Sequence, residues 1–121
     1  MNFAADILVA LVALLHLWFL VLEMFLWTKP LGLKTFRNTL ERAQASRVLA
    51  ANQGLYNGFL SAGLVWGLLA TPVSQAVAVK TFFLTCVGVA GVFGAATVSK
   101  RIFFVQAVPA LLALALLWLS V

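Results

Sequence analysis

The fold follows from one apolar stretch, which reads ADILVALVALLHLWFLVLEMFLWT over residues 5–28. About 20 predominantly apolar residues are enough for a helix to cross the hydrocarbon core of a bilayer, so this stretch predicts a transmembrane helix. It also carries two ionisable side chains, His16 and Glu23. Their seven-residue spacing puts both on one helix face, roughly 10 Å apart along the axis. Because ionisable groups inside a membrane span are rare and usually functional, both are candidate site residues.

The composition extends this interpretation to the whole chain. Of the 121 residues, 64% are hydrophobic and only 9% are charged, which is far from the composition of a soluble globular domain. Four long apolar segments leave almost no sequence for a separate soluble domain. The prediction is an all-α fold, an integral membrane bundle of four transmembrane helices that forms a single domain over residues 1–121. The helices are expected at about 5–28, 46–69, 75–99 and 102–120, with a basic loop over 29–45.

Small residues recur along the second and third predicted helices. Two glycine pairs have four-residue spacing, and the third helix contains GVAGVFGAAT over residues 88–97. Small side chains let a neighbouring backbone approach closely, so both helices are expected to pack tightly. In the last helix, Pro109 cannot donate a hydrogen bond to the carbonyl of Val105, and a bend is expected there. The glycine pairs are Gly54 with Gly58 and Gly63 with Gly67.

The basic residues predict the orientation. Five of them lie between the first and second helices and two between the third and fourth, whereas Lys80 alone lies on the other side. Lys80 is expected to extend to the lipid interface. By the positive-inside rule, both basic loops face the cytoplasm and both termini are extracytoplasmic. This arrangement predicts a multi-pass protein of the cell inner (plasma) membrane. The seven loop residues are Lys29, Lys34, Arg37, Arg42, Arg47, Lys100 and Arg101.

The positive charge has a simpler explanation than nucleic-acid binding. The formal net charge is +5, but the basic residues lie in loops and form no element that could read a base sequence. The chain is therefore not expected to bind nucleic acid. Within the first basic loop, residues 38–45 fit either a short interfacial helix or a solvated loop that touches lipid headgroups.

Polar side chains from several helices are expected at one depth. With the predicted topology, Glu23, Asn52, Gln53 and Gln106 lie about five to seven residues inside the cytoplasmic surface. At about 1.5 Å per residue, this corresponds to a layer roughly 7–10 Å below the apolar boundary. We expect a polar chamber that faces the cytoplasm, with two further polar residues deeper in the membrane. The candidate ligand-binding residues are Glu23, His16, Asn52, Gln53, Asn57 and Gln106.

The same side chains also fit a purely structural interpretation. Asn and Gln in membrane helices often only link neighbouring helices through hydrogen bonds. A lone histidine such as His16 is commonly a packed, hydrogen-bonded residue. A metal site built from His16 and Glu23 would be under-supplied with ligands, since zinc takes three or four from the protein. The single cysteine, Cys86, adds no multi-cysteine site, so no metal is predicted and the cofactor is left unknown.

Several segments together resemble a known family, the small bacterial four-helix integral membrane proteins of domain-of-unknown-function family 1304. The resemblance covers nearly the whole chain and implies a multi-pass membrane protein without an assigned chemistry. It includes Glu23, Asn52, Gln53, Asn57, Gln106 and Pro109. The segments are LEMFLW at 22–27, ANQGLYNGFL at 51–60, GLVWG at 63–67, GAATV at 94–98 and FVQAVPA at 104–110.

Three functions remain open. The first is binding or transport of a small amphipathic or cationic compound, with Glu23 exchanging protons or cations. The second is a structural or assembly role, in which the amides only join neighbouring helices through hydrogen bonds. The third is a membrane enzyme acting on a lipid-soluble substrate, with Glu23 and His16 as acid and base and Asn52 and Gln106 positioning a polar head. The lipid bilayer is the expected partner in each case. The strong charge bias favours a parallel arrangement in any homo-oligomer.

Overall fold

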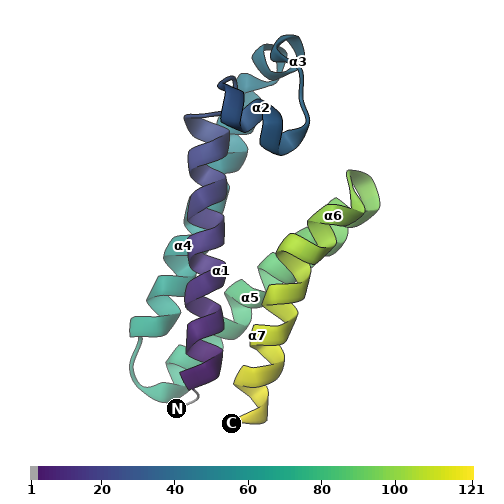
Figure 1. Ribbon diagram of the computed structural model, residues 1–121. Coiled ribbons are helices and arrows are strands. Elements are labelled where there is room, and N and C mark those ends of the chain that lie inside the picture. The colour runs from purple at the N-terminus through teal and green to yellow at the C-terminus, as the bar shows by residue number, and fades with distance from the viewer. Residues whose placement is uncertain (1–2) are drawn as a thin grey trace. The chain divides into compact units, whose positions relative to one another are not determined.

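The computed structural model describes residues 3–121, which are almost entirely helical (Figure 1). Helix accounts for 87% of the structure and the described residues contain no strand, which confirms the predicted all-α class. The elements are α1 (Phe3–Met24), α2 (Pro30–Phe36), α3 (Leu40–Ala45), α4 (Arg47–Leu69), α5 (Val73–Thr97), α6 (Lys100–Ile102), the π-helix η1 (Phe103–Ala107) and α7 (Val108–Leu119).

Three helical segments are long and apolar enough to cross a membrane. They are Phe3–Met24, Val73–Thr97 and Lys100–Leu119, the last of which comprises α6, η1 and α7. With 23 residues α4 is long enough, but Asn52, Gln53 and Asn57 make its first half too polar to meet the same criteria. The structure is therefore compatible with a multi-pass membrane protein.

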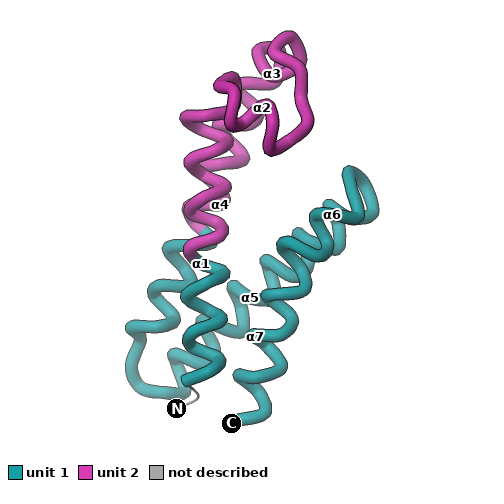
Figure 2. The backbone as a smooth tube through the Cα atoms, in the orientation of Figure 1, with its two compact units in different colours: residues 1–13, 60–121 teal, residues 14–59 magenta. Residues whose placement is uncertain are grey.

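The described part of the chain divides into two compact units (Figure 2). Unit 1 contains the beginning of α1 as far as Ala13 and the segment Leu60–Val121, and unit 2 contains Leu14–Phe59. The division falls within α1 and within α4, so each of these helices contributes to both units.

The core of unit 1 is formed by one face from each of four helices. On α1 the buried side chains include Ala5, Val9 and Val12, which recur at the three- and four-residue spacing of a helix face. The other helices present alanine, valine and leucine side chains to the same core, so the helices approach each other closely. These are Leu64 on α4, Leu84 and Val87 on α5, and Ala110, Ala113 and Leu117 on α7.

The second half of α5 packs closely against the segment that follows it, as the small residues of 88–97 predict. A Cβ atom placed on Gly91 would lie 2.6 Å from the backbone nitrogen of Ala107, and one on Gly94 would lie 2.8 Å from the Cγ2 atom of Ile102. Both separations are too short for a side chain larger than hydrogen. Glycine is therefore required at Gly91, where the neighbour is backbone.

The irregularity expected near Pro109 takes the form of a π-helical turn. Residues Phe103–Ala107 form η1, and Pro109 occupies the first turn of α7. In that first turn its missing N–H is tolerated, because the preceding turn has already left the regular α-helical hydrogen-bond pattern. The π-helix also contains Gln106, one of the predicted site residues.

In unit 2, α1 ends earlier than predicted. The helix expected to reach residue 28 ends at Met24, and Pro30 is the first residue of α2. Gly32 lies so close to the backbone of Leu26 that a side chain there would collide with it. Proline is favoured at the first helical position, which explains why a new helix begins at Pro30.

The end of α1 is tied to the start of α4. The indole Nε1 of Trp27 donates to the hydroxyl of Ser46 at 3.1 Å, and the Trp27 ring lies 4.9 Å from the ring of Phe36 between centroids. Thr39 caps α3 by accepting a hydrogen bond from the backbone nitrogen of Arg42 at 3.2 Å. Of the two alternatives for residues 38–45, the helical one is therefore correct for Leu40–Ala45.

Candidate functional site

Glu23 and Asn57 meet inside unit 2. Glu23 lies in the last turn of α1 and Asn57 lies near the middle of α4. The Nδ2 group of Asn57 donates to the Oε1 atom of Glu23 at 2.5 Å. Asn57 is 5% exposed, and Glu23 is half-buried. A largely buried amide thus orients one oxygen of a half-buried carboxylate.

Two glycines allow this contact. A Cβ atom on Gly54 would lie 2.7 Å from the Cγ atom of Met24 and 3.1 Å from the Cβ atom of Glu23. One on Gly58 would lie 2.6 Å from the Cδ1 atom of Leu20. The close approach that the Gly54–Gly58 pair predicts is therefore found here, where α4 packs on the end of α1. This approach brings the short side chain of Asn57 within hydrogen-bond distance of Glu23.

Among residues 3–121, no basic side chain forms an ion pair with this carboxylate. Within the part of the chain that the structure describes, the one ion pair joins Asp6 and Lys80, both in unit 1. The Oε2 atom of Glu23 likewise receives no hydrogen bond from a described residue. Glu23 therefore has one fixed oxygen and one oxygen without a partner among residues 3–121.

His16 is completely buried on the same helix. Its exposed fraction is 0%, and its ring packs edge-on against Phe19 with the centroids 5.2 Å apart. The two-turn spacing from Glu23 is kept, because both residues lie within α1. Burial on all sides fits the packed histidine of the structural interpretation better than a group that a ligand could reach.

The other predicted site residues lie elsewhere. Asn52 and Gln53 are on α4 with Asn57, but both side chains are exposed. Gln106 is half-buried in η1, within unit 1. The structure thus joins two of the six candidate residues, Glu23 and Asn57. The shared polar layer and the chamber remain predictions.

A second polar cluster, which was not predicted from the sequence, lies in unit 1. The ammonium of Lys80 lies 2.8 Å from the Oδ1 atom of Asp6, with Lys80 only 4% and Asp6 23% exposed. The expectation that Lys80 extends to the lipid interface is therefore wrong. Gly67 packs against the stem of Lys80, which holds the side chain between helices, and Asp6 supplies the opposite charge that makes burial tolerable. The signal was present, because Asp6 and Lys80 were both expected near the same membrane surface.

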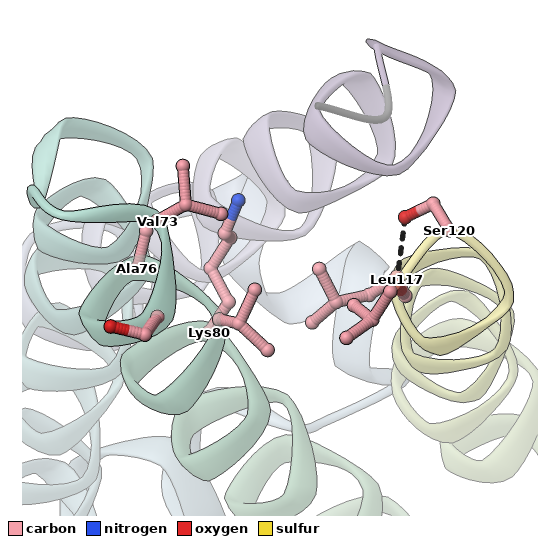
Figure 3. A pocket seen from close by; sticks show the side chains of 8 residues that line it. Val73, Ala76, Lys80, Leu117 and Ser120 are labelled. Atoms are coloured by element: carbon pink, nitrogen blue, oxygen red, sulfur yellow. Dashed lines mark hydrogen bonds between the residues drawn. The ribbon is translucent and has the colours of Figure 1, made fainter.

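A pocket of about 420 Å³ adjoins this ion pair (Figure 3). It lies between the first turns of α5 and the last turns of α7, and its wall is mainly apolar. Lys80 already has its carboxylate partner in Asp6, so the charges beside this pocket are balanced within the protein. The lining residues are Val73, Ser74, Ala76, Val77, Lys80, Leu117, Ser120 and Val121.

The comparison with protein families agrees with the resemblance seen in the sequence. Residues 10–118 match the family described as protein of unknown function (DUF1304). The chain belongs to the DUF1304 family. The match covers both Glu23 and Asn57, together with every other predicted site residue of this DUF1304 protein. No curated protein and no solved structure matches the chain.

Proposed function

We propose that this DUF1304 protein crosses the inner (plasma) membrane with four helices and binds, or transports, a small amphipathic cation at Glu23. The observation that carries the proposal is a carboxylate that has no cationic partner within residues 3–121 and is held in place by a buried amide. The amphipathic character of the compound follows from the apolar surroundings of a site on a membrane-spanning helix.

The contrast with the other polar cluster supports a cationic ligand. Charged groups removed from water are normally paired, because desolvation is costly without an opposite charge nearby. Asp6 and Lys80 satisfy this rule within the protein. Glu23 is half-buried, and its hydrogen-bond partner among the described residues is the neutral amide of Asn57. A bound cation would supply the missing charge at Oε2.

Each of the two residues has a separate role in this proposal. Glu23 provides the negative charge, and Asn57 holds Oε1, so Oε2 is the oxygen that would contact the cation. A carboxylate that can hold either a proton or a cation exchanges one for the other, which is the minimum requirement for coupled transport. His16 is completely buried, and we propose no catalytic role for it.

The test uses tetraphenylphosphonium, an amphipathic cation, and the full chain in lipid nanodiscs. We expect saturable binding that Glu23→Gln weakens at least tenfold, because the substitution removes the charge and keeps the shape. Glu41→Gln is the matched control, since Glu41 is an exposed acid in the same unit. Binding that is unchanged in Glu23→Gln, or equally weakened by Glu41→Gln, contradicts the proposal.

A structural role is the second candidate, because polar contacts link neighbouring helices. The hydroxyl of Ser61 on α4 donates to the Ala13 carbonyl on α1 at 2.8 Å, and Trp118 on α7 donates to Thr81 on α5 at 3.1 Å. If tetraphenylphosphonium does not bind and Glu23→Gln changes only thermal stability, the structural role is the better description.

A further inference from the structure

The segment over residues 29–47, here called the basic cap, combines many positive charges with few negative ones. It contains five basic residues and a single acid, Glu41. All five basic side chains are exposed, and none forms an ion pair with a described residue. Their charge is therefore available to an external partner. The five are Lys29, Lys34, Arg37, Arg42 and Arg47.

The basic cap is a folded surface. Two short helices, α2 and α3, account for most of it. The Trp27–Ser46 hydrogen bond closes the segment at its base, and Phe36 packs on the Trp27 ring. Arg37 has a φ of 51° and ends α2 with two hydrogen bonds from its backbone nitrogen. The charges are thus presented on a fixed backbone, which lowers the entropy lost on binding.

Apolar side chains are exposed on the same two helices. Leu31 is 48% exposed and Leu40 is 49% exposed, and even Phe36 remains 39% exposed beside Trp27. Leu31 and Lys34 are three residues apart on α2, so an apolar and a basic side chain are neighbours on its surface. A soluble polyanion without an apolar region would gain nothing from these apolar groups. A lipid surface offers both negative charge and a place for them.

The position of the cap in the chain also points to the bilayer surface. It begins five residues after Met24, where α1 ends, and α1 is long and apolar enough to cross a membrane. Clusters of four to eight Lys and Arg residues next to a membrane span attract anionic lipids. We propose that the basic cap binds the headgroups of anionic phospholipids in preference to zwitterionic ones.

The experiment compares two lipids with identical acyl chains. The full chain in neutral detergent is titrated with dioleoyl phosphatidylglycerol or dioleoyl phosphatidylcholine, and retained lipid is counted by native mass spectrometry. We expect phosphatidylglycerol to bind at least tenfold more tightly. The variant Lys34→Gln/Arg42→Gln/Arg47→Gln should lose this preference, since each basic residue near an anionic surface contributes about fivefold. Glutamine is a good helix former, so the three exposed positions tolerate it.

The matched control keeps the charge and changes the side chains. Lys34→Arg/Arg42→Lys/Arg47→Lys should retain the preference for phosphatidylglycerol. On the unaltered protein, raising NaCl from low to high concentration should weaken phosphatidylglycerol binding and leave phosphatidylcholine binding unchanged. This measurement decides the question if the glutamine variant fails to fold. Equal affinity for the two lipids, or a preference that is insensitive to salt, overturns the proposal.

Discussion

At the scale of single residues, two acids near opposite ends of α1 have different environments. Asp6 has an ammonium partner, whereas Glu23 has an amide. Glu23 was predictable from its depth in an apolar stretch, and Asn57 was among the candidates on α4. The sequence does not show which amide reaches Glu23. That choice depends on the rotation of α4 about its axis, which Gly54 and Gly58 determine by packing against α1.

Asn57 provides the residue-scale prediction. Asn57→Ala should lower the free energy of unfolding by about 1 kcal/mol, because it leaves the Oε1 atom of Glu23 without its hydrogen-bond donor. Asn52→Ala is the matched control, since Asn52 is the same side chain on the same helix but is exposed. Thermal unfolding in detergent micelles measures both. Equal effects of the two substitutions would show that the hydrogen bond does not stabilise the fold.

At the scale of elements, the long helices were predictable and their ends were not. Sustained apolar character predicts a helix, and the small residues of α5 predict its tight packing. Beyond the early end of α1, Gly32 packs against the backbone of Leu26, and the spacing of apolar residues does not predict this contact. Nor does this spacing predict the π-helix before Pro109. Proline predicts a disturbance, but the chain can respond by bending or by changing its hydrogen-bond pattern.

The packing of α5 provides the element-scale prediction. Gly91→Ala should destabilise the protein by about 1–3 kcal/mol, because the new methyl group would collide with the backbone of Ala107. Gly88→Ala should be tolerated, since the nearest atom to its Cβ would be the Cδ2 atom of Leu111 at 3.6 Å. Both glycines lie on the buried side of α5. Chemical denaturation in micelles compares them, and a tolerated Gly91→Ala would contradict the close approach.

At the scale of the whole molecule, charge and apolarity predict different things. Apolarity predicts the membrane, and three helical segments meet the requirement for crossing it. The proposed fourth span, α4, does not meet this requirement, because Asn52, Gln53 and Asn57 lower its mean hydropathy. Charge alone predicts the orientation, because the positive-inside rule concerns the two faces of the membrane and not the fold. Neither hydropathy nor the positive-inside rule predicts an ion pair such as Asp6–Lys80, because both consider each charged residue separately.

Cysteine labelling tests the proposed four-span topology. In a Cys86→Ala background, Gln44→Cys and Lys100→Cys should react with a membrane-impermeant maleimide only from the cytoplasmic side. Thr71→Cys should react only from the opposite side, because α4 and α5 are joined there. All three positions are exposed. Labelling of Gln44→Cys and Lys100→Cys from different sides would mean that α4 and α5 do not both cross the membrane.

The Asp6–Lys80 ion pair has a consequence for the order in which the chain is made. The two residues are 74 positions apart, so Asp6 leaves the ribosome long before its partner exists. All of α4 and the first turns of α5 must be synthesised before the pair can form. Until then, α1 carries an acid without its cation. Its final attachment to α5 therefore belongs to the late stages of biogenesis, and a chain truncated before Lys80 would lack it.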